Sequence, residues 1–168
     1  RDSLVRAINN DGRYANNFDT VRINYTGSYQ PWKIMIVNLK EESTYSPWVR
    51  DSMKSFIDNS TAGNKKSLIV FGDAIANSND PSTGYPSPAD SVFYRQYLKA
   101  KTISDDWIGS IPASGSRFRG VGFFSGITQD SVSDPYSPEL IKPTNGSTAA
   151  FKPQSVTGNG ADSCNAVC

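Results

Sequence analysis

The chain has 168 residues, which suits one domain with a full core, and 17 basic against 16 acidic side chains give a net charge of +1. The basic residues are scattered, so no nucleic-acid-binding surface is expected. There is no histidine, which excludes Ser-His-Asp and Cys-His catalysis and histidine-ligated zinc or iron within this chain.

The composition is typical of an exported protein. Hydrophobic residues make up 37% of the chain and charged residues 20%, both low for a cytosolic enzyme. No apolar stretch approaches the roughly 20 residues of a membrane span, and no signal peptide is present. Because the chain begins at Arg1 without a methionine, we expect a processed, excised or trimmed product, for which a missing signal does not argue against export.

The only two cysteines, Cys164 and Cys168, lie at the C-terminal end. A disulfide between them in an oxidising compartment is the expected arrangement. An intermolecular link, half of a metal site and two free thiols are the alternatives, and two cysteines alone cannot complete a tetrahedral zinc site. Together with the composition, the pair predicts an extracellular or cell-surface location.

The first two predicted elements are a helix and a strand. Residues 2–10 form an amphipathic helix with Leu4, Val5 and Ile8 at helical spacing, and Asp11-Gly12 ends it. Residues 18–25 alternate apolar and polar side chains, which predicts a strand with one face partly exposed to water.

A βαβ unit follows. Residues 33–39 and 67–71 are nearly continuous apolar runs, which favours central strands covered on both faces. Between them, Pro47 opens a helix. The apolar residues expected on its buried stripe are Trp48, Met53, Phe56 and Ile57. Two strands separated by one helix predict a parallel pair with a right-handed crossover.

After this βαβ unit, the sequence patterns that predict helices and strands are weaker. We expect a polar loop over residues 77–88 and a helix over residues 89–98. The inward side chains of that helix are predicted to be Val92, Phe93, Tyr97 and Leu98. A short strand or turn over residues 103–108 and a strand over residues 118–124 come next. From Thr128 onward, prolines predict a mostly irregular chain.

The turn after the second apolar strand, Phe71-Gly72-Asp73-Ala74, is where catalytic groups collect in a parallel α/β sheet. A nucleophile elbow needs Ser or Cys there, and this turn carries neither. Asp73 is a candidate nucleophile of the aspartyl-phosphate kind, although no lysine, hydroxyl or metal ligand is marked beside it. The alternative is that Asp73 caps the following turn or anchors the next loop.

From this turn onward the sequence resembles a known domain. The string SLIVFGDAIA, then Tyr97-Leu98-Lys99-Ala100 and Asp105-Asp106, and later DPYSPELIKPTNGS, are similar in order and spacing to a domain of exported bacterial proteins, often from Bacteroidetes. The resemblance implies a three-layer, mainly parallel flavodoxin-like fold related to class I glutamine amidotransferases, over residues 1–153. Residues 154–168 would be a polar tail with the cysteine pair.

The resemblance also implies a role. Such domains sit beside peptidase, β-propeller or immunoglobulin-like modules. The amidotransferase cysteine and histidine are absent here, so glutamine hydrolysis is excluded and Asp73 would belong to the scaffold. The chain also departs from the family, because it starts at or inside the first helix and lacks the first strand. We expect another polypeptide, or an upstream segment, to supply that strand.

Several residues carry weaker functional signals. Asn24, Asn59 and Asn145 lie in N-glycosylation acceptor patterns. Asn77, Asn79 and Asp80, with Asp105-Asp106, are oxygen-rich and are candidate calcium ligands, although the spacing does not match an EF-hand. Tyr85 and Trp107 lie near the predicted strand-end rim and are candidate ligand-binding aromatics; the other aromatics are expected in the core.

The sequence therefore favours a non-catalytic structural or interaction domain of a secreted or cell-surface protein, without a cofactor. One alternative is a hydrolase acting on a glycan or peptide through Asp73 with Asp105 or Asp106. The other is a carbohydrate-binding module with exposed coplanar aromatics. The expected partners are other domains or chains of a parent surface protein.

Overall fold

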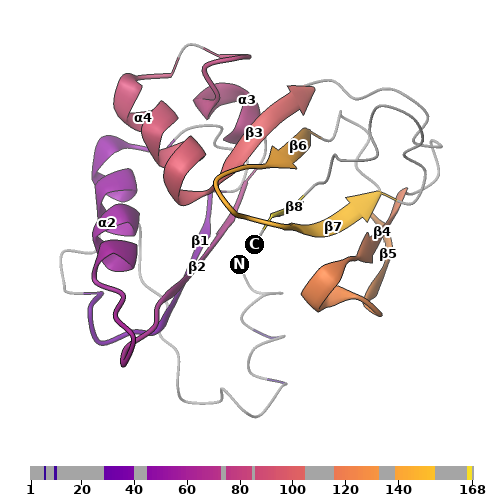
Figure 1. The fold of residues 1–168 in the computed structure, drawn as a ribbon, viewed down its shortest axis with the longest axis horizontal. Helices are drawn as coiled ribbons and strands as arrows, with labels where there is room; N and C mark the ends of the chain where they lie inside the picture. The colour runs from indigo at the N-terminus through magenta and orange to yellow at the C-terminus, as the bar shows by residue number, and fades with distance from the viewer. Residues whose placement is uncertain are drawn as a thin grey trace.

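The computed structural model describes residues 6, 10, 29–39, 45–72, 75–84, 86–104, 116–132, 139–153 and 166–167. In chain order its elements are β1 (Ile34–Asn38), α2 (Pro47–Asp58), β2 (Ser67–Phe71), α3 (Ile75–Asn79), α4 (Pro88–Val92), the π-helical segment η1 (Phe93–Tyr97), β3 (Ala100–Ser104), β4 (Ser116–Gly120), the 3-10 turn η2 (Gly122–Phe124), β5 (Thr128–Val132), β6 (Leu140–Pro143), β7 (Ala149–Pro153) and β8 (Ala166–Val167). The fold is therefore mixed α/β, as the sequence predicts (Figure 1).

The predicted βαβ unit is present. Strands β1 and β2 pair in parallel, in register from Ile34 opposite Ser67 to Asn38 opposite Phe71. Helix α2 lies between them in sequence and beside them in space (Figure 1). Its start follows the expected rule, because the Ser46 side chain accepts a hydrogen bond from the Val49 amide and Pro47 occupies the first turn.

The main core lies between α2, one face of the β1–β2 sheet and η1. The buried residues of this cluster are Leu39, Tyr45, Val49, Met53 and Phe93, with Met35, Val37, Leu68 and Val70 packed against them. Phe56 of α2 is also fully buried. The predicted stripe of α2 was wrong at one position, since the Trp48 side chain is exposed and Val49 takes the buried place.

The other face of the β1–β2 sheet does not follow the prediction of complete burial. Exposed and half-buried residues alternate along both strands, because successive side chains of a strand point to opposite faces. The exposed positions include Ile34, Ile36, Ile69 and Phe71, each between 38% and 49% exposed. A continuous apolar run therefore does not by itself show that both faces are covered.

A buried lysine ties the beginning of β2 to the segment that leads into β1. The Lys66 ammonium donates to the Gln30 carbonyl at 2.7 Å and to the Trp32 carbonyl at 2.8 Å. It also lies 4.7 Å from the centre of the Phe56 ring. These contacts satisfy a charge that would otherwise be costly to bury.

The helix predicted over residues 89–98 is present as α4 and η1 together. The Leu98 amide bonds to the Phe93 carbonyl, the wider spacing of a π-helix. Phe93 is buried as predicted, but Val92 is exposed and Tyr94 is buried in its place. The Phe93 ring packs edge-on against Tyr45 and stacks on Tyr97.

The second half of the chain differs most from the expectation. Residues 77–79, predicted as loop, belong to helix α3. The segment after Thr128, predicted to be mostly irregular, contains β5, β6 and β7, with Pro143 and Pro153 as the last residues of their strands. A proline at a strand end removes few ladder hydrogen bonds, which is why it does not prevent pairing.

These later strands pair antiparallel. Strand β3 pairs with β6, and a second sheet has the order β5-β4-β7-β8. Strand β8, residues 166–167 of the predicted polar tail, pairs with β7, so these two residues belong to the sheet. Among the described residues the parallel arrangement is confined to β1 and β2.

Candidate functional site

The strand-end turn after β2 is the site that the sequence singles out. Asp73 and Ala74 lie outside the described residues. The structure describes the residues on either side of them, up to Gly72 and from Ile75 onward. A side chain added at Gly72 would meet the Ile75 side chain at 2.6 Å, which shows that the chain packs closely there. The buried Ala76 amide then donates to the Glu139 carboxylate at 3.0 Å.

The Glu139 carboxylate therefore accepts the hydrogen bond of the Ala76 amide, a backbone donor shortly after β2. In enzymes of parallel α/β folds, amides at this edge hold substrate anions or stabilise negative charge. Here a carboxylate from the residue before β6 occupies one of them. Sequence reasoning did not identify Glu139, because it lies 63 positions from Ala76 and no local pattern links the two residues.

A second carboxylate, Asp80, follows α3 and is fully buried. Its Oδ1 atom accepts hydrogen bonds from the Ser82 amide at 2.8 Å and the Ser82 hydroxyl at 2.6 Å, and also pairs with Arg95. Its Oδ2 atom accepts from the Thr102 amide. Asp80 thus joins the loop after α3 to η1 and β3.

The pKa of Asp80 reflects this environment. Burial alone would raise it, but hydrogen bonds from Ser82 and Thr102 and the Arg95 guanidinium hold the pKa below its usual value. Asp80 is therefore a charged, satisfied carboxylate rather than a proton donor.

Beside it, the Tyr94 hydroxyl lies 3.5 Å from the Thr102 hydroxyl, and burial raises the pKa of Tyr94. A tyrosine of this kind stays protonated and does not act as a base near neutral pH.

The calcium candidates occupy different environments. The Asn79 side chain is buried and donates to the Ile75 carbonyl at 2.8 Å. Both Asp80 oxygens accept from protein donors, whereas the side chain of Asn77 lies outside what the structure describes. Within the described ranges no three acidic, cysteine or histidine side chains form a group able to hold a metal ion.

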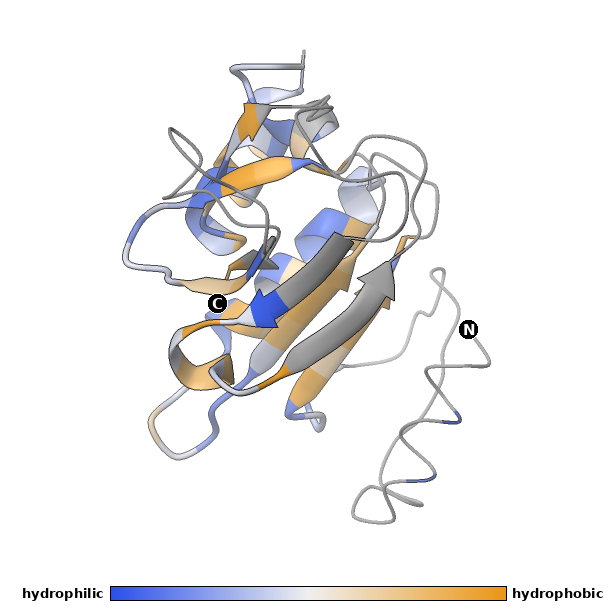
Figure 2. Ribbon diagram, turned by 90° about the vertical axis from the view of Figure 1, so that its right-hand side faces the viewer, coloured by the Kyte–Doolittle hydropathy of each residue, from blue (hydrophilic) through white to orange (hydrophobic). Residues whose placement is uncertain are grey.

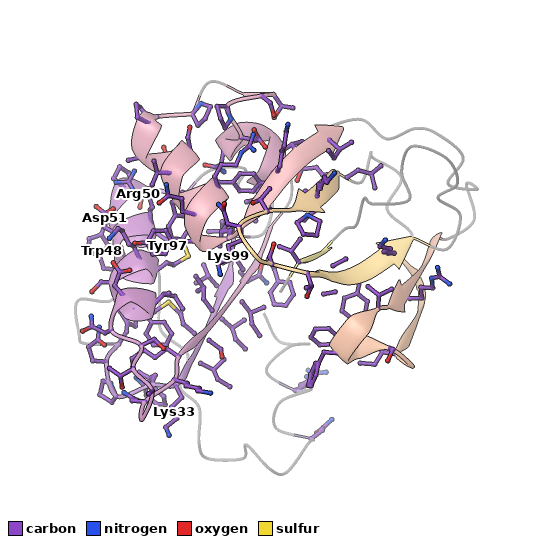
Figure 3. All side chains as sticks on the ribbon, viewed as in Figure 1. Lys33, Trp48, Arg50, Asp51, Tyr97 and Lys99 are labelled. Carbon is purple, nitrogen blue, oxygen red and sulfur yellow. The ribbon has the colours of Figure 1, made fainter. Side chains whose placement is uncertain are left out.

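A groove of about 350 Å³ runs between α2 and the α4–η1 segment. Its lining combines apolar and charged side chains: Arg50, Asp51, Lys54, Pro88, Ala89, Val92, Phe93 and Tyr97. Figure 3 shows Arg50, Asp51 and Tyr97 near one another along this seam.

The charges at the groove are already paired. Arg50 bonds to Asp51 at 2.8 Å and to Asp90 at 2.9 Å, which raises the pKa of its guanidinium. Lys54 pairs with Asp58 at 2.6 Å and lies over the Tyr97 ring. The groove thus offers a ligand apolar surface but few free charges.

The turn between β4 and β5 presents the most exposed large apolar side chain of the described residues. Phe123 is 93% exposed, and Ile127 beside it is half exposed. The colours of Figure 2 mark this turn as apolar. The next ring, Phe124, packs against Phe151 of β7 at 5.4 Å and so anchors the turn.

Backbone hydrogen bonds hold this turn in place. Those within the turn join Phe124 to Val121, Ser125 to Gly122 and Ile127 to Phe124, at 3.0–3.1 Å. The Val121 amide also bonds to the Ala150 carbonyl at 2.9 Å. Gly122 and Gly126 adopt positive φ angles of 57° and 94°, which glycine allows without strain. Phe123 is therefore held outward on an ordered turn.

Two of the glycosylation candidates are described. The Asn59 side-chain amide donates to the Ser55 carbonyl, and that of Asn145 donates to the Arg95 carbonyl at 2.7 Å. Glycosylation at either position stays a prediction, and it would have to displace these bonds. Seven further predicted site residues lie outside the described ranges: Asn24, Tyr85, Asp105, Asp106, Trp107, Cys164 and Cys168.

Comparison of the chain with protein-family models, curated proteins and solved structures found no match. Across the described part of the chain, no helix combines the length and the apolar character that crossing a membrane requires.

Proposed function

We propose that this chain is a non-catalytic interaction domain of a secreted or cell-surface protein, built on a flavodoxin-like three-layer fold. The parallel β1–β2 pair with α2 packed on one face supports the architecture. The exported character of the composition supports the location. The domain acts by joining other modules or chains of its parent protein rather than by transforming a substrate.

The observation that carries this proposal is the Phe123 side chain. Exposed phenylalanines are ordinary on loops without internal hydrogen bonds, but the backbone that carries the almost fully exposed Phe123 ring is fixed by hydrogen bonds. Binding to such a ring costs little backbone entropy, and buried aromatic anchors dominate many interfaces. A partner surface with an apolar pocket fits this turn.

The contacts at the end of β2 support the proposal that the domain is non-catalytic. The Ala76 amide is bonded to Glu139, and the Asp80 oxygens are bonded to Ser82, Arg95 and Thr102. These groups are satisfied within the protein, so a substrate would have to displace them. Stabilising contacts of this kind suit a scaffold better than an open catalytic centre.

The proposal includes a partner strand. The β1–β2 sheet has two strands in the described part of the chain, whereas flavodoxin-like sheets have five. A strand supplied by another polypeptide, or by a segment upstream of Arg1, extends this sheet by main-chain hydrogen bonds.

The test is the mass of the native particle. The protein is isolated from the cells that make it and weighed by light scattering after size-exclusion chromatography. Wild type is expected to travel in an assembly larger than one copy, and Phe123→Ser to shift that assembly toward the single chain. Asp51→Ser is the control, because Asp51 is also exposed but lies on α2.

Two results contradict the proposal. One is a wild type that is a single copy in native extracts at every concentration. The other is an assembly that Phe123→Ser leaves unchanged.

A further inference from the structure

The groove between α2 and the α4–η1 segment, called the α2–η1 groove below, has the size of a small-molecule site. Its volume is about 350 Å³. An apolar cavity of about 150 Å³ holds one benzene ring, and ligand pockets of folded proteins begin at about 300 Å³. The groove is therefore large enough for a compact ligand of one or two rings.

Two aromatic rings form one wall of the groove. The Phe93 and Tyr97 rings stack with 5.5 Å between their centres and 16° between their planes. Val92, which is 45% exposed, adds apolar surface to this wall. The Tyr97 hydroxyl donates to Asp58 at 2.9 Å, so its polar end is satisfied within the protein. Aromatic rings attract a further ring in offset or edge-to-face contact, beyond the effect of apolar area alone.

The wall on α2 consists of long charged side chains whose charged ends are already bonded. Arg50 pairs with Asp51 and Asp90. Lys54 pairs with Asp58. The aliphatic stems of such side chains offer apolar surface beside their charged ends. A charged ligand would have to open one of these ion pairs, whereas a neutral ligand would leave them intact.

The segment that carries the two rings is π-helical. The Leu98 amide bonds to the Phe93 carbonyl at 3.1 Å, the wider spacing of a π-helix. On the core side, the Tyr45 ring packs edge-on against Phe93 at 5.3 Å and holds it in place. π-Helical segments are rare and occur frequently at functional sites. This observation is independent of the volume and the lining of the groove.

We infer that the α2–η1 groove binds a small, neutral, aromatic molecule of one or two rings. The apolar walls hold the ring, and no charged group is needed because the charges at the rim are paired. The β4–β5 hairpin that carries Phe123 lies away from α2 and α4 (Figure 1). The inference therefore does not depend on assembly through Phe123, and the two proposals can fail separately.

Four probes of nearly equal size test the site in the full chain. They are benzyl alcohol, its saturated counterpart cyclohexylmethanol, the anion benzoate and the cation benzylamine. Each is titrated into isotopically labelled protein, and the amide chemical shifts are followed by nuclear magnetic resonance. The shifts give both the dissociation constant and the place of binding.

Benzyl alcohol is expected to saturate one site with a dissociation constant of about 1 mM or below, the range for a ligand of so few atoms. The amide signals that shift should be those of Val92, Phe93 and Tyr97. Cyclohexylmethanol should bind about two- to tenfold more weakly, because it lacks the aromatic contact. Neither benzoate nor benzylamine should bind more tightly than benzyl alcohol.

A substitution in the lining shows whether the groove is the site. Val92→Arg places a long charged side chain there, and the exposure of Val92 lets the fold accommodate it. This variant should raise the dissociation constant of benzyl alcohol by about tenfold or more. The matched control is Gln96→Arg, which adds the same side chain at an exposed position of η1 outside the lining and should leave binding unchanged.

Four results would overturn the inference. The first is no saturable binding of benzyl alcohol at ten times the expected concentration, and the second is unchanged binding by Val92→Arg. Tighter binding of benzoate or benzylamine would show that an ion pair at the rim opens for a charged ligand. Equal binding of cyclohexylmethanol and benzyl alcohol would refute the aromatic assignment.

Discussion

Asp80 is a buried charged residue whose partners lie on other elements. Its carboxylate is fully buried and accepts hydrogen bonds from Ser82, Arg95 and Thr102. Asp80→Asn removes the charge and points a donor group at other donors. We expect the free energy of unfolding to fall by about 3–5 kcal/mol, measured by urea denaturation, because Arg95 loses its partner. Asp51→Asn, on the surface, should change it by less than about 0.5 kcal/mol.

The same residue predicts how stability depends on pH. Because the folded-state pKa of Asp80 lies below the unfolded value of about 3.9, the unfolded chain binds more protons in the window between the two. The stabilisation is complete above pH about 4 and is lost as the pH falls through the folded-state pKa. Asp58, whose pKa Lys54 lowers, contributes in the same direction.

Denaturation at a series of pH values below 4 tests this dependence. The wild type should lose stability more steeply than Asp80→Asn as the pH falls. Parallel curves for the two proteins would show that Asp80 is not the source of the acid sensitivity.

Lys66 gives a third prediction at this scale. In Lys66→Met the carbonyls of Gln30 and Trp32 lose their donor, while the side chain still fills the space beside Phe56. Stability measured by urea denaturation should fall by about 1–3 kcal/mol. The neighbouring lysine is the control, because Lys65 is exposed and Lys65→Met should change little. Equal effects of the two substitutions would contradict the hydrogen bonds from Lys66 to the Gln30 and Trp32 carbonyls.

The sequence indicated which residue types were available but not their pairing. Asp80 was a candidate because it lies in an oxygen-rich run, yet its partners Arg95 and Thr102 lie 15 and 22 positions away on other elements. Glu139 was not identified at all. Such contacts depend on how the elements pack, which local spacing does not encode.

At the scale of elements, the β4–β5 hairpin depends on a glycine. A Cβ atom at Gly120 would lie 1.8 Å from the Phe124 carbonyl oxygen, so any side chain forces the turn to move. Gly120→Ala should therefore destabilise the protein by several kcal/mol, on the order of other severe packing changes, in thermal or urea unfolding. Gly63→Ala is the control, since nothing lies within 4 Å of its added Cβ. The packing of the turn is refuted if the two alanine variants are equally stable.

The elements that the sequence predicted well are those with strong local signals. The β1–α2–β2 unit follows from two apolar runs and a capped helix, and its parallel pairing is confirmed. Strands β5, β6 and β7 were missed because prolines and polar residues mask short antiparallel pairing. Trp48 and Val92 show the limit of helical periodicity, since each lies at the margin of an apolar stripe and is exposed.

The molecule as a whole combines buried charges that are paired within the fold with two apolar surfaces. Its buried charges, Asp80 and Lys66, are bonded within the fold, whereas Phe123 and the β1–β2 face are exposed among the described residues. Contiguous exposed apolar surface on a folded protein commonly marks a contact. We assign the Phe123 turn to a partner.

The most direct test of the interaction role places a photoreactive phenylalanine analogue at position 123 in the cells that make the protein. After illumination, peptide mapping should find one defined partner segment linked to position 123, in another protein, a neighbouring module or a second copy. The same analogue at position 51, an exposed site on α2, should give no defined product. Indistinguishable, diffuse products from the two positions would contradict the proposal that the Phe123 turn is an interface.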